Sequence, residues 1–296
     1  MENGLTEVWS SRWFKGVQKV FSHSSHKYFT LLFSLSSELK CTVNFGIYLP
    51  DLKEGEKAPV LLYLSGLTCT EDNFIRKSAF QRYASELKMI VVNTDTSPRG
   101  DDVEDDPESY DIGKGAGFYV DALNPKWDRH YRMYSYITKE IPRLITENFP
   151  QCDKNKWGIF GHSMGGHGAI VIGLRNPDIF KSISAFAPIC NPTKSQWGQK
   201  VFPAYLGTDS NIWKSYDAVE VIKAYSGREV KILIDQGTVD EFLEQLMPIS
   251  LEAAPSNKVH IQLRYQEGYD HSYAFVSTFI EEHLRFHKDV LSQTST

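Results

Sequence analysis

One serine stands between two glycines where a short apolar segment meets a helix start rich in small residues. The stretch Lys156 to Gly168 reads KWGIFGHSMGGHG, so Ser163 forms a G-x-S-x-G pattern with Gly161 and Gly165. A strand that turns sharply into a helix strains the serine backbone and lifts its hydroxyl clear of the sheet, and glycines are needed where side chains would collide. The pattern predicts Ser163 as the nucleophile of an acyl transfer; the alternative is a turn that only packs small residues.

His271 is the predicted base for this serine. A serine hydroxyl is a weak nucleophile at neutral pH, so an imidazole must take its proton and a carboxylate must orient that imidazole. Among nine histidines, His271 lies in a glycine-preceded loop after the last predicted strand, from which it can reach across to the serine. His162 and His167 flank the serine, and we expect them to orient or pack rather than to act as the base.

The remaining candidate histidines are given structural roles. His260 alternates with apolar residues in a predicted strand, which is typical of the polar face of that strand. His283 and His287 are one helical turn apart, but neither a HExxH arrangement nor a third ligand accompanies them. We interpret this pair as part of a solvated helix face, and we expect neither a metal nor an organic cofactor.

Two aspartates compete for the role of orienting carboxylate. The segment DQGTVD places Asp235 at the end of a predicted strand and Asp240 on the loop that follows it. Asp235 could instead cap the turn, whereas Asp240 projects towards the loop of His271. Spacing favours Asp240 only slightly, so the residues alone leave both aspartates open.

Stabilising a tetrahedral oxyanion requires two backbone N–H groups, and one of them is expected from Met164, the residue after the nucleophile. The second is expected from Leu67, in a glycine-containing loop that follows an early strand. Cys69 then lies near the site; it is a weaker nucleophile candidate than the serine but could make activity sensitive to thiol reagents. Aromatic residues such as Trp197 are core by default, and some could wall a narrow acyl pocket.

Seven β-rich apolar runs alternate with helical stretches and must position these residues. The strands are expected at Val43 to Leu49, Val60 to Leu64, Met89 to Asn93, Trp157 to Phe160, Ile183 to Phe186, Val230 to Ile234 and Val259 to Tyr265. The helices are expected at Asp72 to Leu87, Arg132 to Phe149 with a kink at Pro142, Ser163 to Arg175, Glu241 to Ala254 and Ser272 to Asp289. This alternation predicts an α/β fold with a mostly parallel central sheet, helices on both faces and antiparallel N-terminal strands. The chain order serine, aspartate, histidine is that of an α/β-hydrolase.

Composition narrows the classes of partner. The formal net charge is −5 and no run of Lys or Arg occurs, which argues against nucleic acid or an anionic membrane as a partner. Four widely spaced cysteines and the lack of a secretory signal predict a cytoplasmic protein. Residues 28–33 are too short to cross a bilayer and are interpreted as a strand. We expect one domain over residues 1–296, with about 1–12 and 289–296 as loose ends.

Four blocks of sequence in this order carry a family resemblance. They are SGLTCTE from Ser65, GAGFYVDA from Gly115, GHSMGGHG from Gly161 and EGYDHSY from Glu267. Together, over about residues 14–287, they closely resemble the S-formylglutathione hydrolase family, also called esterase D. The resemblance implies a thioesterase that hydrolyses S-formylglutathione to glutathione and formate in formaldehyde detoxification, through a formyl-serine intermediate, and it suggests a homodimer.

By this resemblance Ser163 is the nucleophile, His271 the base and Asp240 the orienting acid, and Leu67 with Met164 form the oxyanion hole. The chain departs from the family pattern in two places. Residues 26–33 look like an insertion of about eight residues, and the loop of residues 244–247 looks two or three residues shorter than usual. Two other functions stay open: a broad carboxylesterase or acyltransferase on the same fold, and a hydrolase-like binding protein without catalysis.

Overall fold

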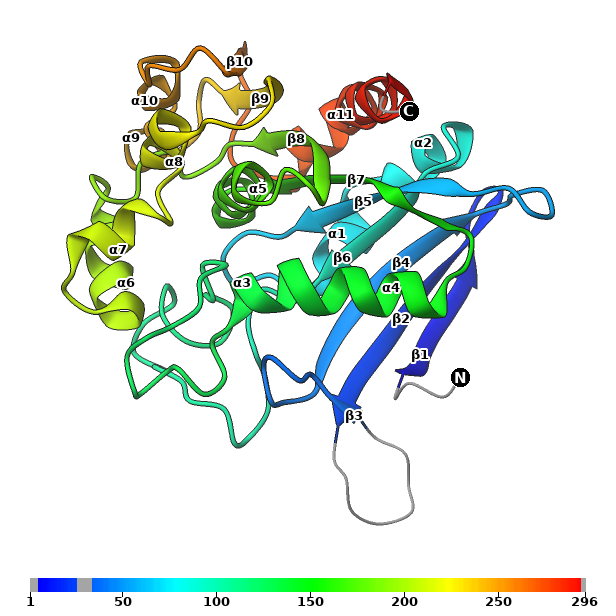
Figure 1. The fold of residues 1–296 in the computed structure, drawn as a ribbon, viewed down its shortest axis with the longest axis horizontal. Helices are drawn as coiled ribbons and strands as arrows, with labels where there is room; N and C mark the ends of the chain where they lie inside the picture. Colours follow the sequence, from blue (N-terminus) through cyan, green and yellow to red (C-terminus); the bar gives the residue numbers. More distant parts are fainter. Residues whose placement is uncertain (1–4, 26–33, 294–296) are drawn as a thin grey trace.

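A single sheet organises the molecule, for which the computed structural model describes residues 5–25 and 34–293 (Figure 1). The strands are β1 (Leu5–Arg12), β2 (Gly16–Ser25), β3 (Ser34–Leu35), β4 (Val43–Pro50), β5 (Ala58–Leu64), β6 (Ile90–Thr94), β7 (Cys152–His162), β8 (Phe180–Phe186), β9 (Val230–Gly237) and β10 (Val259–Gln266). Their spatial order is β1-β2-β4-β6-β5-β7-β8-β9-β10, and β3 pairs with β2 off this path.

Strand direction divides the sheet into two parts. The strands from β6 through β5, β7, β8 and β9 to β10 are mutually parallel, whereas β1, β2 and β4 are antiparallel to their neighbours and β4 is antiparallel to β6. Every residue of β5 and β6 is buried, as expected for parallel strands covered on both faces. The predicted fold class and all seven predicted strands are therefore confirmed.

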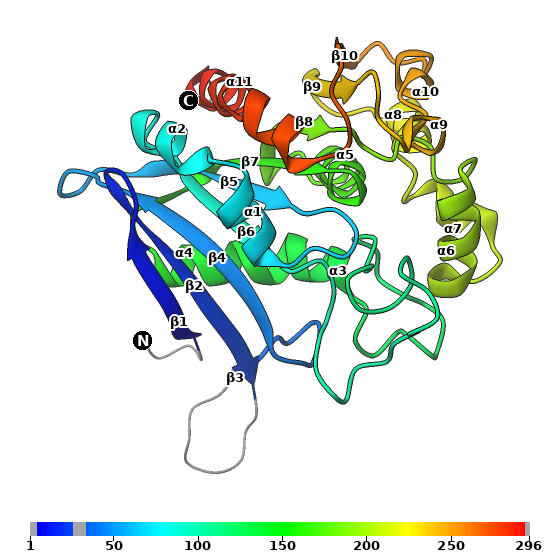
Figure 2. The same cartoon turned by 180° about the vertical axis from the view of Figure 1, so that it is seen from behind.

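Helices cover both faces of this sheet. On one face lie α1 (Glu71–Lys77), α2 (Phe80–Glu86) and α11 (Tyr273–Gln293), which come to the front in the reverse view (Figure 2). On the other face lie α4 (Ile141–Asn148) and α5 (Met164–Arg175), with α8 (Ala218–Ala224) packed against α5. The remaining helical segments are α3 (Met133–Ser135), the π-helical segment η1 (Tyr136–Glu140), α6 (Gln196–Leu206), α7 (Ser210–Lys214), α9 (Leu243–Leu246) and α10 (Ile249–Glu252). Figure 1 shows α6, α7 and the long connection from β6 to α3 gathered beyond the carboxyl ends of the parallel strands.

Three of the predicted helices differ from the structure in continuity. The helix expected over residues 72–87 is interrupted at Ala79, which has a left-handed φ of 57°, and the one over 241–254 is interrupted at Met247, with a φ of 54°. The helix over 132–149 changes register through η1, which is followed directly by α4, and Pro142 lies in the first turn of α4.

The chain ends are more regular than expected within the described residues. Residues 5–12, which we expected to be loose, form β1 because they pair with β2, and residues 289–293 continue α11. The strands β1 and β2 and the helices α6 to α8 were not predicted. The strand expected at residues 28–33 and the apparent insertion at 26–33 lie outside the described residues. The single-domain interpretation stays a prediction, which a buried apolar cluster extending from Leu5 to Leu291 supports.

Candidate active site

The turn between β7 and α5 holds Ser163 in a strained conformation. Its φ of 58° and ψ of −120° lie outside the regions that non-glycine residues favour. A Cβ at Gly161 would lie 2.4 Å from the Gly165 carbonyl oxygen, and one at Gly165 would lie 2.0 Å from the Leu64 carbonyl oxygen. Both glycines are therefore required by close approach of the backbone, as the sequence pattern predicts.

The loop after β5 lies directly against this turn. A Cβ built on Gly66 would be 3.1 Å from the Ser163 Cβ. Within the described residues, neither the N–H of Leu67 nor that of Met164 has a protein acceptor. Met164 also begins the twelve-residue α5, whose positive dipole end favours an anion. The two N–H groups are thus free to bind a developing oxyanion.

Buried hydrogen bonds fix the front of this loop. The hydroxyl of Tyr119, which is 1% exposed, donates to the Ser65 carbonyl oxygen at 2.9 Å. The N–H of Thr68 donates to the Gly115 carbonyl oxygen at 2.8 Å. The block of sequence from Gly115 to Ala122 therefore contributes to the site by holding the loop of Leu67 in place, a role that its residue types did not indicate.

The back of the loop is fixed through the carbonyl oxygen of Cys69. This oxygen accepts hydrogen bonds from the Thr96 hydroxyl at 2.5 Å and from the Arg99 guanidinium at 3.2 Å. Asp95, in turn, accepts two hydrogen bonds from Arg99, at 2.8 and 3.0 Å. Burial raises the pKa of Asp95, although the hydrogen bonds from Arg99 oppose that shift. This partly buried ion pair thereby anchors the end of the loop of Leu67 to the connection that follows β6.

His271 and Asp240 form a hydrogen-bonded pair beyond the ends of β9 and β10. His271 Nδ1 lies 2.7 Å from Asp240 Oδ2, and the other carboxylate oxygen accepts the N–H of Phe242 at 2.8 Å. The N–H of His271 donates to the Glu241 carboxylate at 3.3 Å. Residues 244–247, the segment that looks shorter than the family pattern, overlap most of α9. Asp240 nevertheless reaches His271.

Gly237 allows the two loops to meet. A Cβ at Gly237 would lie 2.2 Å from the Tyr269 carbonyl oxygen, so only glycine permits this close approach. Beyond it, the N–H of Val239 donates to the same carbonyl at 3.1 Å, and the N–H of Thr238 donates to the Gln266 carbonyl at 3.0 Å. These backbone contacts tie the loop of the aspartate to the loop of the histidine.

The serine and the histidine face a common cavity of about 270 Å³. It is lined by Gly66, Leu67, Thr68, Cys69, Tyr110, His162, Ser163, Trp197, Phe242, His271, Ser272 and Tyr273. Among the hydrogen bonds of the described residues, none joins the Ser163 hydroxyl to His271, and such bonds are often long before substrate binds. The cavity brings together Ser163, the imidazole of His271 and the loop of Leu67, which are the predicted nucleophile, base and oxyanion donor, and its walls are mainly apolar.

The histidines that flank the serine are buried and packed. The His162 ring lies against the His271 ring, with centroids 4.5 Å apart, and burial lowers the pKa of His162 well below its usual value, with a further contribution from His271. His167 places its Nε2 2.7 Å from the Tyr216 carbonyl oxygen, and burial lowers its pKa as well. Neither ring is placed as His271 is, because among these three histidines only His271 contacts the Asp240 carboxylate.

Cys69 and Trp197 both line the cavity, as the sequence led us to expect. Burial raises the pKa of the Cys69 thiol, so at neutral pH the group is the poorly nucleophilic thiol rather than the thiolate. The Trp197 indole donates to the Tyr110 hydroxyl at 3.0 Å and packs against Phe242, with ring centroids 5.3 Å apart. These aromatic groups form the wall of the cavity next to His271.

Asp235 does not act as a turn cap. It is fully buried and accepts two hydrogen bonds of 2.6 Å from the Arg264 guanidinium, and its Oδ2 lies 3.4 Å from His283 Nε2. Burial alone would raise the pKa of Asp235, but His283 and Arg264 hold it below the usual value. Since both oxygens of Asp235 are engaged there, the geometry leaves Asp240 as the carboxylate beside His271.

The interpretation of His283 and His287 as a solvated face was wrong. Both are fully buried where α11 packs on the sheet. His283 Nδ1 lies 2.8 Å from the Ser184 hydroxyl, while His287 places Nδ1 2.6 Å from the Ser182 hydroxyl and Nε2 2.8 Å from that of Ser184. Serines on β8 thus provide polar partners that a helix pattern alone cannot reveal. Across residues 5–25 and 34–293, no cluster of three or more His, Cys, Asp or Glu side chains could hold a metal ion.

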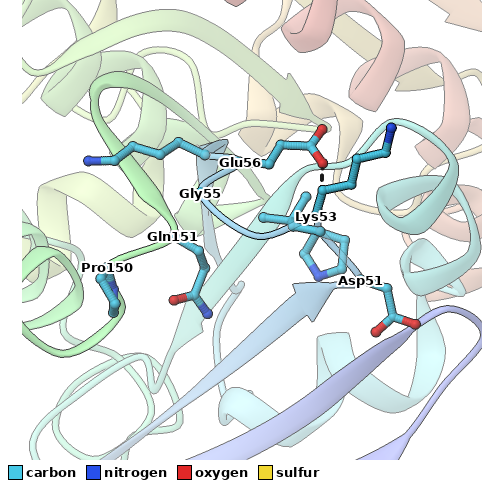
Figure 3. Close-up of a pocket in the computed structure, with 9 residues that line it drawn as sticks. Asp51, Lys53, Gly55, Glu56, Pro150 and Gln151 are labelled. Atoms are coloured by element: carbon cyan, nitrogen blue, oxygen red, sulfur yellow. Dashed lines mark hydrogen bonds between the residues drawn. The ribbon is translucent and has the colours of Figure 1, made fainter.

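A second hollow, of about 510 Å³, lies at the opposite ends of the strands, where β5 and β7 begin (Figure 3). The N–H of Lys53 donates there to the Glu56 carboxylate at 3.0 Å. Asp51 pairs with Arg12, and Glu56 with Lys88. Its carboxylates already have partners, and the hollow contains no counterpart to the paired imidazole and carboxylate of the 270 Å³ cavity.

Comparisons with known proteins agree with this geometry. Residues 36–286 match the family model described as "Putative esterase". An S-formylglutathione hydrolase of Mus musculus is 51% identical over 97% of this chain and 99% of its own length, and one of Arabidopsis thaliana is 48% identical over 98% and 99%. The solved structure of an S-formylglutathione hydrolase from Agrobacterium tumefaciens superposes with a TM-score of 0.90 at 44% identity, covering 97% of this chain and 99% of that one.

Proposed function

The chain belongs to the S-formylglutathione hydrolase family, and from that premise we propose that it hydrolyses S-formylglutathione to glutathione and formate. The observation that carries this proposal is the shared cavity. In it, Ser163 at a strained turn and His271 hydrogen-bonded to Asp240 face the same space beside two unpaired backbone N–H groups.

The first half-reaction forms a formyl enzyme. Ser163 Oγ attacks the formyl carbon while His271 Nε2 takes the hydroxyl proton, and the carbonyl oxygen becomes an oxyanion bound by the N–H groups of Leu67 and Met164. Collapse of the tetrahedral intermediate breaks the carbon–sulfur bond and releases glutathione thiolate, which takes up the proton held by His271 and so returns the imidazole to its neutral form. Because a thiolate is a good leaving group, this step depends more on the oxyanion donors than on His271 as an acid.

The second half-reaction restores the enzyme. Water attacks the formyl ester of Ser163 while His271 takes a proton from the water. His271 then returns this proton to Ser163 Oγ, so formate leaves and the serine hydroxyl is re-formed. Asp240 holds His271 in the tautomer with Nδ1 protonated, which leaves Nε2 free to face the serine. The chemistry requires neither a metal nor an organic cofactor.

The direct test is replacement of Ser163 by Ala. Steady-state hydrolysis of S-formylglutathione should fall to a residual rate, by about four or more orders of magnitude, as in other triads whose nucleophile is removed. Near-normal turnover by a folded Ser163→Ala protein would overturn the proposal. Labelling of the intact protein by a fluorophosphonate should require Ser163, and failure to label would favour a silent binding protein.

Substrate preference separates thioesterase from general esterase. The ratio of kcat/KM for S-formylglutathione to that for an aryl acetate should favour the thioester. A preference of a hundredfold or more for the aryl acetate would favour a broad carboxylesterase on the same fold.

We further propose a cytoplasmic homodimer. The four cysteines are unpaired and three are buried, which suits a reducing compartment, and no helix of the described residues combines the length and the apolarity that a membrane crossing needs. Three exposed apolar residues lie at the β10 edge of the sheet, which supports pairing of two copies: Val239 after β9, Ile249 in α10, which contacts β10, and Tyr265 in β10 itself. Light scattering of the purified protein should give twice the mass of the 33.8 kDa chain.

A further inference from the structure

One side chain of the site has no role in the mechanism so far, although it contacts the orienting carboxylate. Gln236 is the penultimate residue of β9 and is fully buried. Its Nε2 donates to Asp240 Oδ2 at 3.0 Å and to the Gly237 carbonyl oxygen at 3.2 Å. Asp240 Oδ2 is also the atom that faces His271 Nδ1 at 2.7 Å. One carboxylate oxygen is therefore shared between the catalytic imidazole and a buried amide.

We propose that Gln236 is a positioning residue that sets the strength of the Asp240–His271 pair by sharing the carboxylate oxygen to which the imidazole is bound. This inference rests on the proposed function of the triad. It adds to that function a buried amide that determines at which pH the imidazole can accept the serine proton.

The chemistry of the amide fixes its direction. A carboxylate can only accept hydrogen bonds, so the NH₂ end of Gln236 must face Asp240, and the opposite orientation would set its Oε1 against a negative oxygen. In the described part of the chain that Oε1 has no partner. A buried oxygen without a hydrogen-bond partner is costly, so the hydrogen bonds donated by Nε2 must keep the amide in this orientation.

The shared oxygen has a predictable electrostatic effect. A hydrogen bond to a carboxylate disperses its negative charge and so weakens its attraction for a neighbouring cation. With Gln236 present, Asp240 has three donors, namely Gln236, His271 and the Phe242 N–H. Without Gln236, the Asp240 carboxylate attracts a positive charge on His271 more strongly. This favours the imidazolium form of His271, which cannot accept a proton from the serine.

The other titratable groups around His271 are present in a Gln236 variant as in the unsubstituted protein. They are His162 at the end of β7, Tyr273 at the start of α11, Cys69 on the loop after β5, Tyr110 on the connection from β6 to α3, Glu241 on the loop of Asp240 and Asp270 on the loop of His271. Asp235, which precedes Gln236, faces Arg264 and His283 instead. A change in the pH profile of a Gln236 variant is therefore assigned to the lost amide.

The chain offers a closely matched control. Gln18 in β2 is also fully buried, donates to the carbonyl oxygen of the next residue at 3.2 Å and to that of Ile47 at 3.1 Å, and leaves its Oε1 unpaired. Gln18→Met and Gln236→Met thus remove the same group from the same kind of environment. Only the second exchange removes a donor from the triad.

The experiment is the pH dependence of kcat/KM for S-formylglutathione. For Gln236→Met we expect the acid limb of the profile, where kcat/KM falls as the pH decreases, to move to higher pH by about half a unit or more. The maximal kcat/KM should fall by about tenfold, because Asp240 loses one of the hydrogen bonds that hold it in place. Gln18→Met should leave the limb where it is in the unsubstituted protein. An unshifted limb in folded Gln236→Met would overturn the proposal.

Two further measurements keep the test decisive. If the Met variant does not fold, Gln236→Asn keeps an amide one methylene too short to reach Oδ2, and the same upward shift is expected; its absence counts against the proposal. In an Asp240→Asn background, Gln236→Met should move the limb no further, because the charge that it acts through is gone. An equal shift in both backgrounds would show that Gln236 acts elsewhere.

The outcome can be told apart from failure of the proposed function. An active Ser163→Ala protein would remove the triad itself. If Ser163→Ala is inactive but the acid limb of the Gln236→Met profile is not shifted, only the inference about Gln236 is contradicted. In the unsubstituted protein, the side-chain amide resonances of Gln236 should change over the pH range of the acid limb, and fixed resonances there would also contradict it.

Discussion

Ser163 is held in a conformation that serine rarely adopts, and three backbone contacts maintain it. Its N–H donates to the Phe186 carbonyl at 2.9 Å, and its carbonyl oxygen accepts the N–H of His167 at 3.0 Å and that of Ile189 at 3.3 Å. Strain persists only where the surroundings over-determine it. The neighbouring strand β8 therefore has as much part in presenting the hydroxyl as the two glycines do.

At the same scale, the hydroxyl of Tyr119 should matter for turnover although it touches no substrate. Tyr119→Phe leaves the Ser65 carbonyl without its buried donor, which costs about 1–2 kcal/mol and loosens the oxyanion loop. We expect kcat for S-formylglutathione to fall about three- to tenfold, measured at saturating substrate. Tyr131→Phe, which removes a hydrogen bond to the Glu104 carbonyl, is the matched control, and an equal loss in both variants would contradict the assignment.

At the scale of elements, the reactive pair depends on two loops that follow adjacent parallel strands. Since β9 and β10 run in register, from Val259 opposite Val230 to Gln266 opposite Gly237, their carboxyl ends lie side by side. Asp240 and His271 follow these ends by three and five residues, respectively, so neighbouring strands bring together residues 31 positions apart. This is the usual place for a site in an open α/β sheet.

Gly237→Ala tests this contact between the loops. The new methyl group would lie 2.2 Å from the Tyr269 carbonyl, so the loop of His271 must move away from Asp240. We expect a loss of about 1–3 kcal/mol in stability, and a fall in kcat/KM of tenfold or more in the folded fraction. Gly46→Ala in β4 is the control. Its new methyl group would lie 2.7 Å from side-chain atoms of Asn93 and Ile75, so we expect lower stability without the fall in kcat/KM. Normal kinetics for Gly237→Ala would show that the contact is dispensable.

At the scale of the whole molecule, four of the five histidines that are buried in the described part of the chain share one electrostatic effect: His162, His167, His283 and His287. Burial lowers the pKa of each below the ordinary value of 6.5. In the unfolded chain these rings bind protons at higher pH than in the folded protein. Their contribution to stability is therefore complete above about pH 6.5 and is lost as the pH falls from there towards the folded-state values.

We accordingly expect the free energy of unfolding to fall steeply between about pH 6.5 and 5, by up to about 1.4 kcal/mol per pH unit for each histidine that stays neutral in the folded state. Urea unfolding at a series of pH values measures this slope. His287→Gln should lower stability at pH 7. It should also reduce the pH dependence of the unfolding free energy, by an amount equivalent to at most one proton taken up on unfolding. His260→Gln, at an exposed position, is the control and should leave that dependence unchanged. A slope unchanged by His287→Gln would mean that this ring does not carry the acid sensitivity.

Local signals predicted the parts of the fold that depend on neighbours in sequence. The parallel strands are apolar runs because both faces are covered, and the turn at Ser163 needs glycines at fixed offsets, so each leaves a pattern that can be read along the chain. The interruption at Ala79 has no glycine or proline beside it, whereas the one at Met247 comes directly before Pro248, which disfavours a helical conformation in the preceding residue. The edge strand β1 and its neighbour β2 were not predicted, because polar and apolar residues are mixed along both of them.

The sequence by itself determined the fold class and the family, since residue types at fixed short spacings indicate both, and a pattern of the same kind predicted Ser163 as the nucleophile. Only the tertiary structure decided what distant residues do to one another. It engaged Asp235 with Arg264 and set Asp240 beside His271, it buried His283 and His287 against serines of β8, and it placed Gln236 on the shared carboxylate oxygen. The physical reason is that a side chain's role depends on the partners within about 3 Å of its polar atoms, and folding chooses those partners from segments far apart in the chain.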